Sequence, residues 1–194
     1  MRGFAGVVVL RNNFVLLVSE PDYFTAEPRW TFPSGGIDEG EGPAAAAARE
    51  LADESGCVID SRVLELVAVA DVERDGATLS RSWNYTATTT ETALEPRDDP
   101  DEIVTEARWF EHAEAVKLLA QASPAPKVEP ALRFLTSGDR NLHWTFDLVD
   151  DSTSVPSFRV GPSGHGAART IGTVAVLPVA GSLRVTSGWL SGRP

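Results

Sequence analysis

Residues 35–57 read GGIDEGEGPAAAAARELADESGC, and this stretch decides how the rest of the chain is interpreted. Pro43 precedes a run of alanines. Proline suits the first position of a helix, and alanine has the highest helix propensity. Gly56 is a typical stop signal at a helix end. The pattern therefore predicts a helix over residues 43–55, preceded by an acidic loop that is rich in glycine.

The predicted helix brings three carboxylates together. Glu50, Asp53 and Glu54 are three and four positions apart, so they share one helical face at about 100° per residue. Two interpretations are open. The face is either solvated and partly neutralised by Arg49, or it is a divalent-cation site, since carboxylate oxygens suit Mg²⁺ and Mn²⁺. The glycines of the preceding loop favour the cation site, because they let the backbone approach a ligand closely.

Strands alternate with helices along the rest of the chain. Apolar runs at residues 3–10 and 14–19 flank an Asn12–Asn13 turn, a pattern typical of a β-hairpin. Further strands are expected at residues 30–32, 57–72, 78–91 and 107–110, and further helices at 113–121 and 129–136. This order predicts an α/β (α+β) sandwich. One face of the first helix is expected to pack onto the sheet through Ala44, Ala47, Ala48 and Leu51.

The composition changes beyond about residue 137. Residues 150–194 are rich in Gly, Ser, Pro, Val and Ala and poor in charge. We therefore expect one domain over residues 1–137 and a C-terminal extension over 138–194 that is partly ordered or disordered. Within the extension, residues 170–177 and 182–186 are suited to pair as a hairpin. A chain that ends near residue 136 is expected to stay folded.

Charge and apolar patterning exclude several classes of partner. The chain has 17 Lys and Arg against 28 Asp and Glu, a formal net charge of −11. Nucleic acids and anionic membranes require clustered basic residues, so neither is an expected partner. There is no unbroken apolar run of about 18 residues, and there is no clear secretion signal. The single cysteine, Cys57, cannot form an internal disulfide. We expect a cytoplasmic protein.

The spacing within residues 35–57 resembles the Nudix box, G-x5-E-x7-R-E-U-x-E-E-x-G-U, where U is a bulky aliphatic residue. The matching positions are Gly35, Glu41, Arg49, Glu50, Leu51, Glu54 and Gly56. Two positions depart from the motif, since Asp53 replaces a glutamate and Cys57 replaces the last aliphatic residue. The resemblance extends more loosely over residues 3–136. It implies a Nudix-type α/β/α sandwich with a mixed sheet.

The resemblance also implies a chemistry and a set of roles. Nudix hydrolases cleave the pyrophosphate bond of a nucleoside diphosphate linked to another group, here a small nucleotide, with water activated by Mg²⁺ or Mn²⁺. By motif position, the metal ligands are Glu50, Asp53 and Glu54. The supporting residues are Arg49, which orients the acids; Glu41, which holds the loop or another metal; and Gly35 and Gly56, which permit the two turns. Relatives often form homodimers.

Several assignments stay open at this stage. The general base is either Glu54 or an acid outside the box, with Glu102 and Glu106 as candidates. Candidate phosphate contacts are Arg29 and Arg81, and candidate base-stacking residues are Trp30, Trp83 and Tyr85. An ordinary surface or core position is the alternative for each of these side chains. The main alternative to an enzyme is a non-catalytic nucleotide-sensing domain, and a third possibility is an interaction protein with a vestigial pocket.

Overall fold

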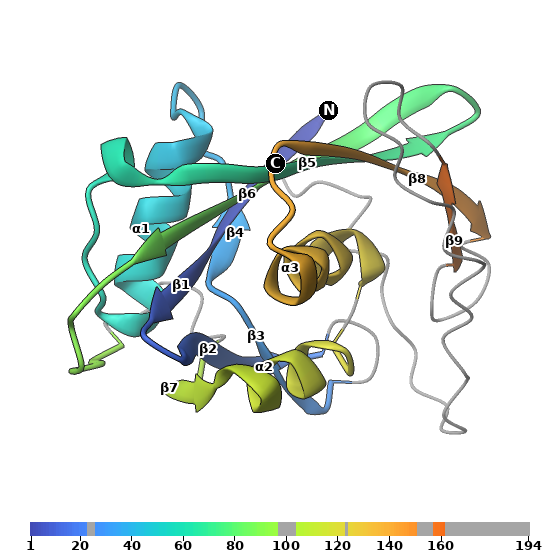
Figure 1. Cartoon of the computed structure of the whole chain (residues 1–194). Coiled ribbons are helices and arrows are strands. Elements are labelled where there is room, and N and C mark those ends of the chain that lie inside the picture. The colour runs from blue at the N-terminus through green and yellow to red at the C-terminus, as the bar shows by residue number, and fades with distance from the viewer. Residues whose placement is uncertain (23–25, 97–103, 123, 151–156, 162–194) are drawn as a thin grey trace.

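The computed structural model describes residues 1–22, 26–96, 104–122, 124–150 and 157–161 (Figure 1). The strands in these residues are β1 (Arg2–Arg11), β2 (Phe14–Pro21), β3 (Pro28–Thr31), β4 (Ser34–Gly36), β5 (Glu65–Arg74), β6 (Ala77–Thr88), β7 (Glu106–Glu111), β8 (Leu142–Asp150) and β9 (Ser157–Gly161). The helices are α1 (Pro43–Ser55), α2 (His112–Leu119) and α3 (Ala125–Ser137), together with a short 3-10 helix, η1 (Ser61–Val63).

All of these strands belong to one mixed sheet. The order of hydrogen-bonded neighbours is β3-β2-β1-β6-β5-β8-β9, with β4 paired to β1 and β7 paired to β2. The pairs β1–β6 and β5–β8 are parallel, and the other pairs are antiparallel. The mixed sheet expected from the sequence is confirmed.

The sheet separates two apolar cores. Helix α1 covers one face, and α2 and α3 lie on the other (Figure 1). Successive side chains of a strand point to opposite faces, so Val7 and Val9 of β1 pack on the α1 side and Val8 packs on the other. A central strand covered on both faces is expected to be apolar, as β1 is over residues 4–10. The α/β/α sandwich is therefore confirmed.

The α1 face that packs on the sheet differs slightly from the expected one. Ala46, Ala47 and Leu51 are buried, whereas Ala44 and Ala48 are only half-buried. The buried stripe is thus rotated from the predicted one. This rotation brings Glu54, three residues after Leu51, towards the core.

The tight turns contain residue types that tolerate a left-handed backbone conformation. Asn12 joins β1 to β2 with φ of 54°, as expected for the Asn-Asn hairpin. Asp75 and Gly76 join β5 to β6 with φ of 52° and 77°. Two successive positive φ angles suit the right-handed twist of a two-residue hairpin, and Asp-Gly is a preferred sequence for it.

Three elements differ from the sequence-based prediction. The strand expected over residues 57–72 begins only at Glu65, and Ser61–Val63 form the 3-10 helix η1 instead. Ser34–Gly36 was expected in a loop, but it forms β4, because its backbone pairs with Phe4–Gly6 of β1. Helix α3 starts at Ala125 rather than near residue 129, which places Pro130 inside the helix instead of in its first turn. Pro130 is buried, and we attribute its tolerance there to packing, which offsets the missing N–H.

The sheet continues beyond residue 137. Strand β8 pairs in parallel with β5, and β9 pairs with β8. Trp144, Phe146 and Phe158 are buried in the core beneath α3, with Trp144 and Phe146 stacked at 5.8 Å between ring centroids. The hairpin expected over residues 170–177 and 182–186 lies outside the described residues.

A charge cluster around the buried Asp71 also joins β8 to β5 and β6. Asp71 of β5 accepts two hydrogen bonds from Arg81 of β6, at 2.6 and 2.8 Å, and lies 2.8 Å from His143 Nε2 of β8. Burial would raise the pKa of Asp71, but the hydrogen bonds from Arg81 and His143 outweigh it and lower the pKa. Three adjacent strands are therefore held together by side-chain hydrogen bonds as well as by backbone pairing.

Within the described part of the chain, no helix has the length and apolar character that crossing a bilayer requires.

The burial of Phe146 predicts how strongly β8 supports the fold. Phe146→Ala should lower the free energy of unfolding by about 3–5 kcal/mol, because it leaves a cavity in the core. Val149→Ala on the same strand is the matched control, since Val149 is exposed and its change should stay within about 0.5 kcal/mol. Chemical denaturation measures both values.

A truncation tests the domain boundary itself. A chain that ends at residue 137 lacks β8 and β9, so we now expect it to unfold at lower denaturant than a chain that ends at residue 161. Equal midpoints for the two chains would instead support the boundary drawn from composition.

Candidate functional site

Glycines fix both ends of α1. Gly42 precedes the helix and Pro43 takes its first position. At the other end, Gly56 has φ of 73° and donates its N–H to the Ala52 carbonyl. A Cβ at position 56 would lie 2.2 Å from the Glu95 carbonyl oxygen, so only glycine allows that segment to pass this close. The helix end expected at Gly56 is confirmed.

Arg49 ties the acidic loop to the helix. Its Nε and Nη2 donate to the two carboxylate oxygens of Glu41 at 3.1 and 3.0 Å, and Nη2 also donates to the Gly36 carbonyl at 2.9 Å. Its Nη1 donates to Glu50 Oε1 at 2.8 Å. The bond from Arg49 lowers the pKa of Glu41, and the same bond raises the pKa of Arg49. These bonds join Glu41 and Gly36, which precede the helix, to Arg49 within it.

The close approach of Glu50 to β4 explains the glycine at position 35. A Cβ on residue 35 would lie 2.2 Å from Glu50 Oε1. Any side chain at position 35 would therefore displace the Glu50 carboxylate. Glycine is needed here for space, and its left-handed freedom is not used, since Gly35 is part of β4.

Glu54 is the most unusual carboxylate of the site. Its side chain lies on the buried stripe of α1, and the residue is only 7% exposed. The backbone N–H of Ser34 donates to its Oε2 at 3.0 Å. The pKa of Glu54 is raised to about 8. Burial is the largest cause, the nearby carboxylates of Glu20 and Glu50 act in the same direction, and Lys127 and the Ser34 N–H oppose them.

These carboxylates do not form the shared exposed face expected from helical periodicity. Glu54 is buried, Glu50 is mostly buried against Arg49, and Asp53 is half-buried. Among the described residues, no three His, Cys, Asp or Glu side chains are close enough together to hold a metal ion.

The pair Glu50 and Glu54 nevertheless fits a hard cation. Two neighbouring carboxylates, one of them buried with a raised pKa, favour a positive charge between them. Mg²⁺ is commonly held by one or two carboxylates plus water and substrate phosphates. The donor set therefore suits Mg²⁺ or Mn²⁺ without a third protein ligand.

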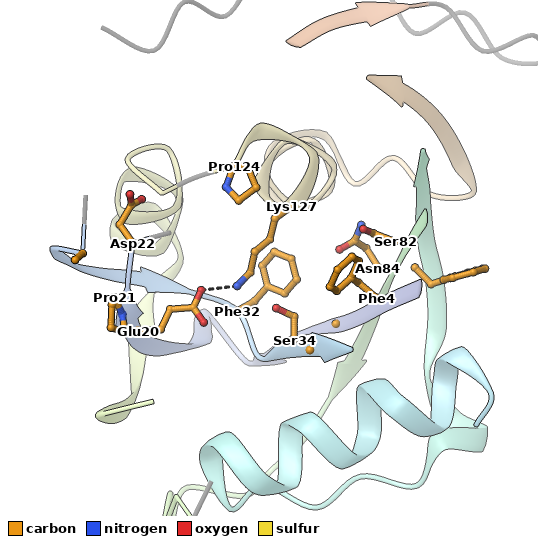
Figure 2. Close-up of a pocket in the computed structure, with 14 residues that line it drawn as sticks. Phe4, Glu20, Pro21, Asp22, Phe32, Ser34, Ser82, Asn84, Pro124 and Lys127 are labelled. Carbon is orange, nitrogen blue, oxygen red and sulfur yellow. Dashed lines mark hydrogen bonds and ion pairs between the residues drawn. The ribbon is translucent and has the colours of Figure 1, made fainter. Parts of the chain in front are cut away.

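A cavity of about 510 Å³ opens next to this site, between the sheet and the start of α3 (Figure 2). Ser34 and Gly35 of β4 form part of its wall and connect it to Glu54 and Glu50. Lys127 of α3 extends into it, and its Nζ lies 2.5 Å from Glu20 Oε1 of β2 (Figure 2). The size is that of a small-molecule site. The remaining lining residues include Phe4, Phe32, Trp83, Ser82, Asn84 and Asp22.

The expected phosphate contacts lie elsewhere. Arg29 does not line the cavity, and Arg81 is paired with Asp71 in the charge cluster of β5 and β6. The structure gives Arg81 a partner within the sheet, at 2.6 Å between its Nε and Asp71 Oδ1. Glu106 is half-exposed on β7, paired with Arg108 Nε at 2.5 Å, and Glu102 lies outside the described residues.

The three candidate stacking residues occupy three different environments. Trp83 lines the cavity. Trp30 packs edge-to-face on Phe110 at 4.7 Å, and Tyr85 packs in the core under α1. Trp83 shares its side of β6 with Tyr85, and its Cζ3 would lie 3.5 Å from a Cβ on Gly3, so its ring lies on the α1 side of the sheet.

Two cavity residues were missed by the sequence analysis. Lys127 is one of only two lysines in the chain, which was a signal that it stands apart, but nothing in the sequence placed it near residues 35–57. Asn84 is a polar residue in the middle of a predicted strand. The signal that could have identified Asn84 is a polar residue within a strand that helices cover on both faces.

Comparison with known proteins agrees with this geometry. The model of the NUDIX domain matches residues 1–132. The chain belongs to the Nudix family. Human diphosphoinositol polyphosphate phosphohydrolase 3-alpha is 33% identical over 114 residues, which cover 59% of this chain and 65% of that protein. An RNA pyrophosphohydrolase of Cereibacter sphaeroides is 43% identical over 63 residues, 32% of this chain and 38% of that protein.

Solved structures show the same Nudix fold. The NUDIX hydrolase from Nitrosomonas europaea aligns with a TM-score of 0.60 at 18% identity, covering 75% of this chain and 78% of that one. The match to the curated relatives is less complete, since the chain spans just under two thirds of the length of the human protein.

The raised pKa of Glu54 predicts a pH-dependent stability. A pKa raised from 4.5 to about 8 on folding stabilises the protein fully below about pH 4.5, and this stabilisation is lost as the pH rises through 8. Without metal, the wild type should therefore lose stability relative to Glu54→Gln between pH 5 and pH 8.5, by an amount on the order of a few kcal/mol. Denaturation at several pH values in EDTA measures this difference.

Subtracting the free energies of unfolding of the two proteins at each pH removes the contributions of groups that titrate in both. Parallel stability curves for the wild type and Glu54→Gln would show that the carboxyl of Glu54 titrates normally and is not buried as described.

Proposed function

We propose that this chain is a metal-dependent Nudix pyrophosphohydrolase that cleaves the pyrophosphate bond of a nucleoside diphosphate derivative. The observation that carries the proposal is the buried carboxylate of Glu54, beside Glu50 and adjoining a ligand-sized cavity. The relatives named as phosphohydrolases and pyrophosphohydrolases support the same bond type. The remaining details, including a homodimer and a cytoplasmic location, are expectations from the sequence.

The carboxylates of Glu50 and Glu54 would hold Mg²⁺ or Mn²⁺, and Asp53 is an additional candidate ligand through water. When bound, such an ion neutralises the diphosphate and lowers the pKa of a bound water. Arg49 fixes the Glu50 carboxylate from one side, and the Gly35 backbone leaves room for it on the other. The Ser34 N–H orients Glu54.

Glu54 also has the properties of a proton acceptor. A pKa of about 8 lies near neutral pH, where a carboxylate takes up and releases a proton most effectively during catalysis. A bound cation lowers that pKa, so Glu54 cannot fill both roles to the full extent. Glu106 remains a second proposed base, with its carboxylate on β7 and paired with Arg108.

One observation favours a non-catalytic alternative. The described residues gather no three-carboxylate cluster, and position 53 carries the shorter Asp. A nucleotide-sensing domain would keep the cavity and dispense with tight metal binding. Binding of a nucleotide without release of phosphate products, with either metal, would support that alternative.

The test of the enzyme is a substrate panel on the full chain. Nucleotide sugars, ADP-ribose, dinucleoside polyphosphates, nucleoside triphosphates and diphosphoinositol polyphosphates are incubated with Mg²⁺ or Mn²⁺, and products are separated by chromatography. We expect turnover of at least one diphosphate and its loss in EDTA. Glu54→Gln should lower kcat by about 100-fold or more, since the ion contributes several kcal/mol of charge stabilisation.

Glu114→Gln is the matched control for this substitution. Glu114 is an exposed glutamate on α2 that does not line the cavity, so its removal should leave kcat and KM unchanged. Turnover by Glu54→Gln at the wild-type rate would contradict the proposed role of the buried carboxylate.

A further inference from the structure

Lys127 is the one lysine or arginine among the described residues that line the cavity. The chain has only one other lysine, Lys117. The side chain of Lys127 extends from α3 into the cavity and is only 20% exposed (Figure 2). Burying an ammonium group is costly unless an opposite charge lies close to it. The partners of Lys127 therefore indicate what the residue does.

The direct partner of Lys127 is Glu20 on β2. The Lys127 Nζ lies 2.5 Å from Glu20 Oε1, and the Glu20 side chain is also 20% exposed. The two residues are 107 positions apart in the sequence, so the pair joins α3 to the first hairpin of the sheet. A structural brace is one use of such a pair, but its position relative to α1 adds a second.

The charges of this pair also act on Glu54 of α1. Burial is the largest influence on the pKa of Glu54. After burial come Lys127, which lowers this pKa, and Glu20, which raises it. Ser34 connects these groups, because it lines the cavity with Lys127 and Glu20 while its N–H donates to Glu54. Elements β2, α1 and α3 thus bring one ammonium and two carboxylates together.

An ammonium in this place competes with a divalent cation. The proposed function assigns the cation to Glu50 and Glu54, so the cation and Lys127 would repel each other beside Glu54. Repulsion between partly buried charges is screened less than repulsion on the surface. Lys127 should therefore oppose cation binding. Glu20 should favour it, because Glu20 holds the ammonium and adds a negative charge.

The other charged groups near the site do not take over this effect. Asp22 on the cavity wall is an acid, so it favours a cation in the same way as Glu20. Arg49 is bonded to Glu41, Glu50 and the Gly36 carbonyl, which hold its guanidinium beside the loop that precedes α1.

We propose that Lys127 is a built-in counter-ion of the carboxylate site that weakens the binding of a divalent cation, and that Glu20 limits this effect by holding the ammonium away from Glu54. The pair sets the metal affinity through two opposite charges on two different elements. This inference rests on the proposed function, because it takes Glu50 and Glu54 as the metal ligands.

The first experiment measures the affinity of the full chain for Mn²⁺, by electron paramagnetic resonance of the unbound ion. Lys127→Met should tighten Mn²⁺ binding at least about threefold, and Glu20→Gln should weaken it by a similar factor, because the two side chains carry opposite charges. A pair that only braces α3 would change the affinity in the same direction in both variants or leave it unchanged. Either of these results would overturn the proposal.

Lys117→Met and Glu114→Gln are the matched controls. Both residues are exposed on α2 and do not line the cavity, but the substitutions change the net charge in the same way. Salt screens exposed charges, so both controls should bind Mn²⁺ as the wild type does at about 0.15 M salt. An effect of Lys117→Met as large as that of Lys127→Met would show that net charge alone sets the affinity, which would overturn the proposal.

A double variant tests the part assigned to Glu20. Lys127→Met should tighten Mn²⁺ binding more in the Glu20→Gln protein than in the wild type, because an ammonium that has lost Glu20 moves towards Glu54. Strictly additive effects of the two substitutions would overturn the assignment to Glu20.

The wild type itself provides a direct readout, because it contains only two lysines. Protein labelled with ¹³C at the lysine ε-carbons should give two lysine signals, which Lys117→Met assigns. Saturating Mg²⁺ should shift the signal of Lys127 and leave that of Lys117 in place. An unmoved Lys127 signal would overturn this inference and leave the proposed function standing. Failure of the wild type to bind either metal would overturn the proposed function, and this inference with it.

Discussion

The carboxylate of Glu54 is buried where α1 meets β4. Its burial depends on the packing of α1 on β1 and on the pairing of β4 with β1. The helix must press its alanine stripe onto β1, which requires slim side chains at Ala46 and Ala47. The Ser34 N–H must reach the carboxylate, which requires β4 to pair with β1 at Gly6 and Ala5. A Cβ on Gly6 would lie 2.6 Å from the Ser34 Cβ, so glycine there is part of the same constraint.

Arg49 performs a complementary task on the other side of the helix. It places one guanidinium between Glu41 of the loop and Glu50 of the helix, so two acids are held by one cation. The result is a division between neutralised and unneutralised carboxylates. Glu41 has a lowered pKa, while Glu54 has a raised one. Pairs of titratable groups whose pKa values are shifted in opposite directions are typical of catalytic sites.

Much of the fold was predictable because local signals agree with it. Pro43, the alanine run and Gly56 define α1, and Asn12 and Asp75-Gly76 define two hairpins. The burial of Glu54 was not predictable, since helical periodicity places it three positions from both Leu51 and Cys57 without saying which face meets the sheet. The cavity was also beyond reach, because Glu20, Asn84 and Lys127 are distant in sequence and meet only through the topology of the sheet.

Cys57 ends the region around α1 with a buried thiol, and burial raises its pKa above the usual value. A thiol in this state reacts slowly with alkylating reagents and oxidants, because the thiolate is the nucleophile. Cys57 is also the only cysteine in the chain. A cysteine introduced on the surface would consequently be the single accessible thiol of the folded protein, so a thiol-reactive fluorophore or spin label would attach at one chosen position without first removing the native residue.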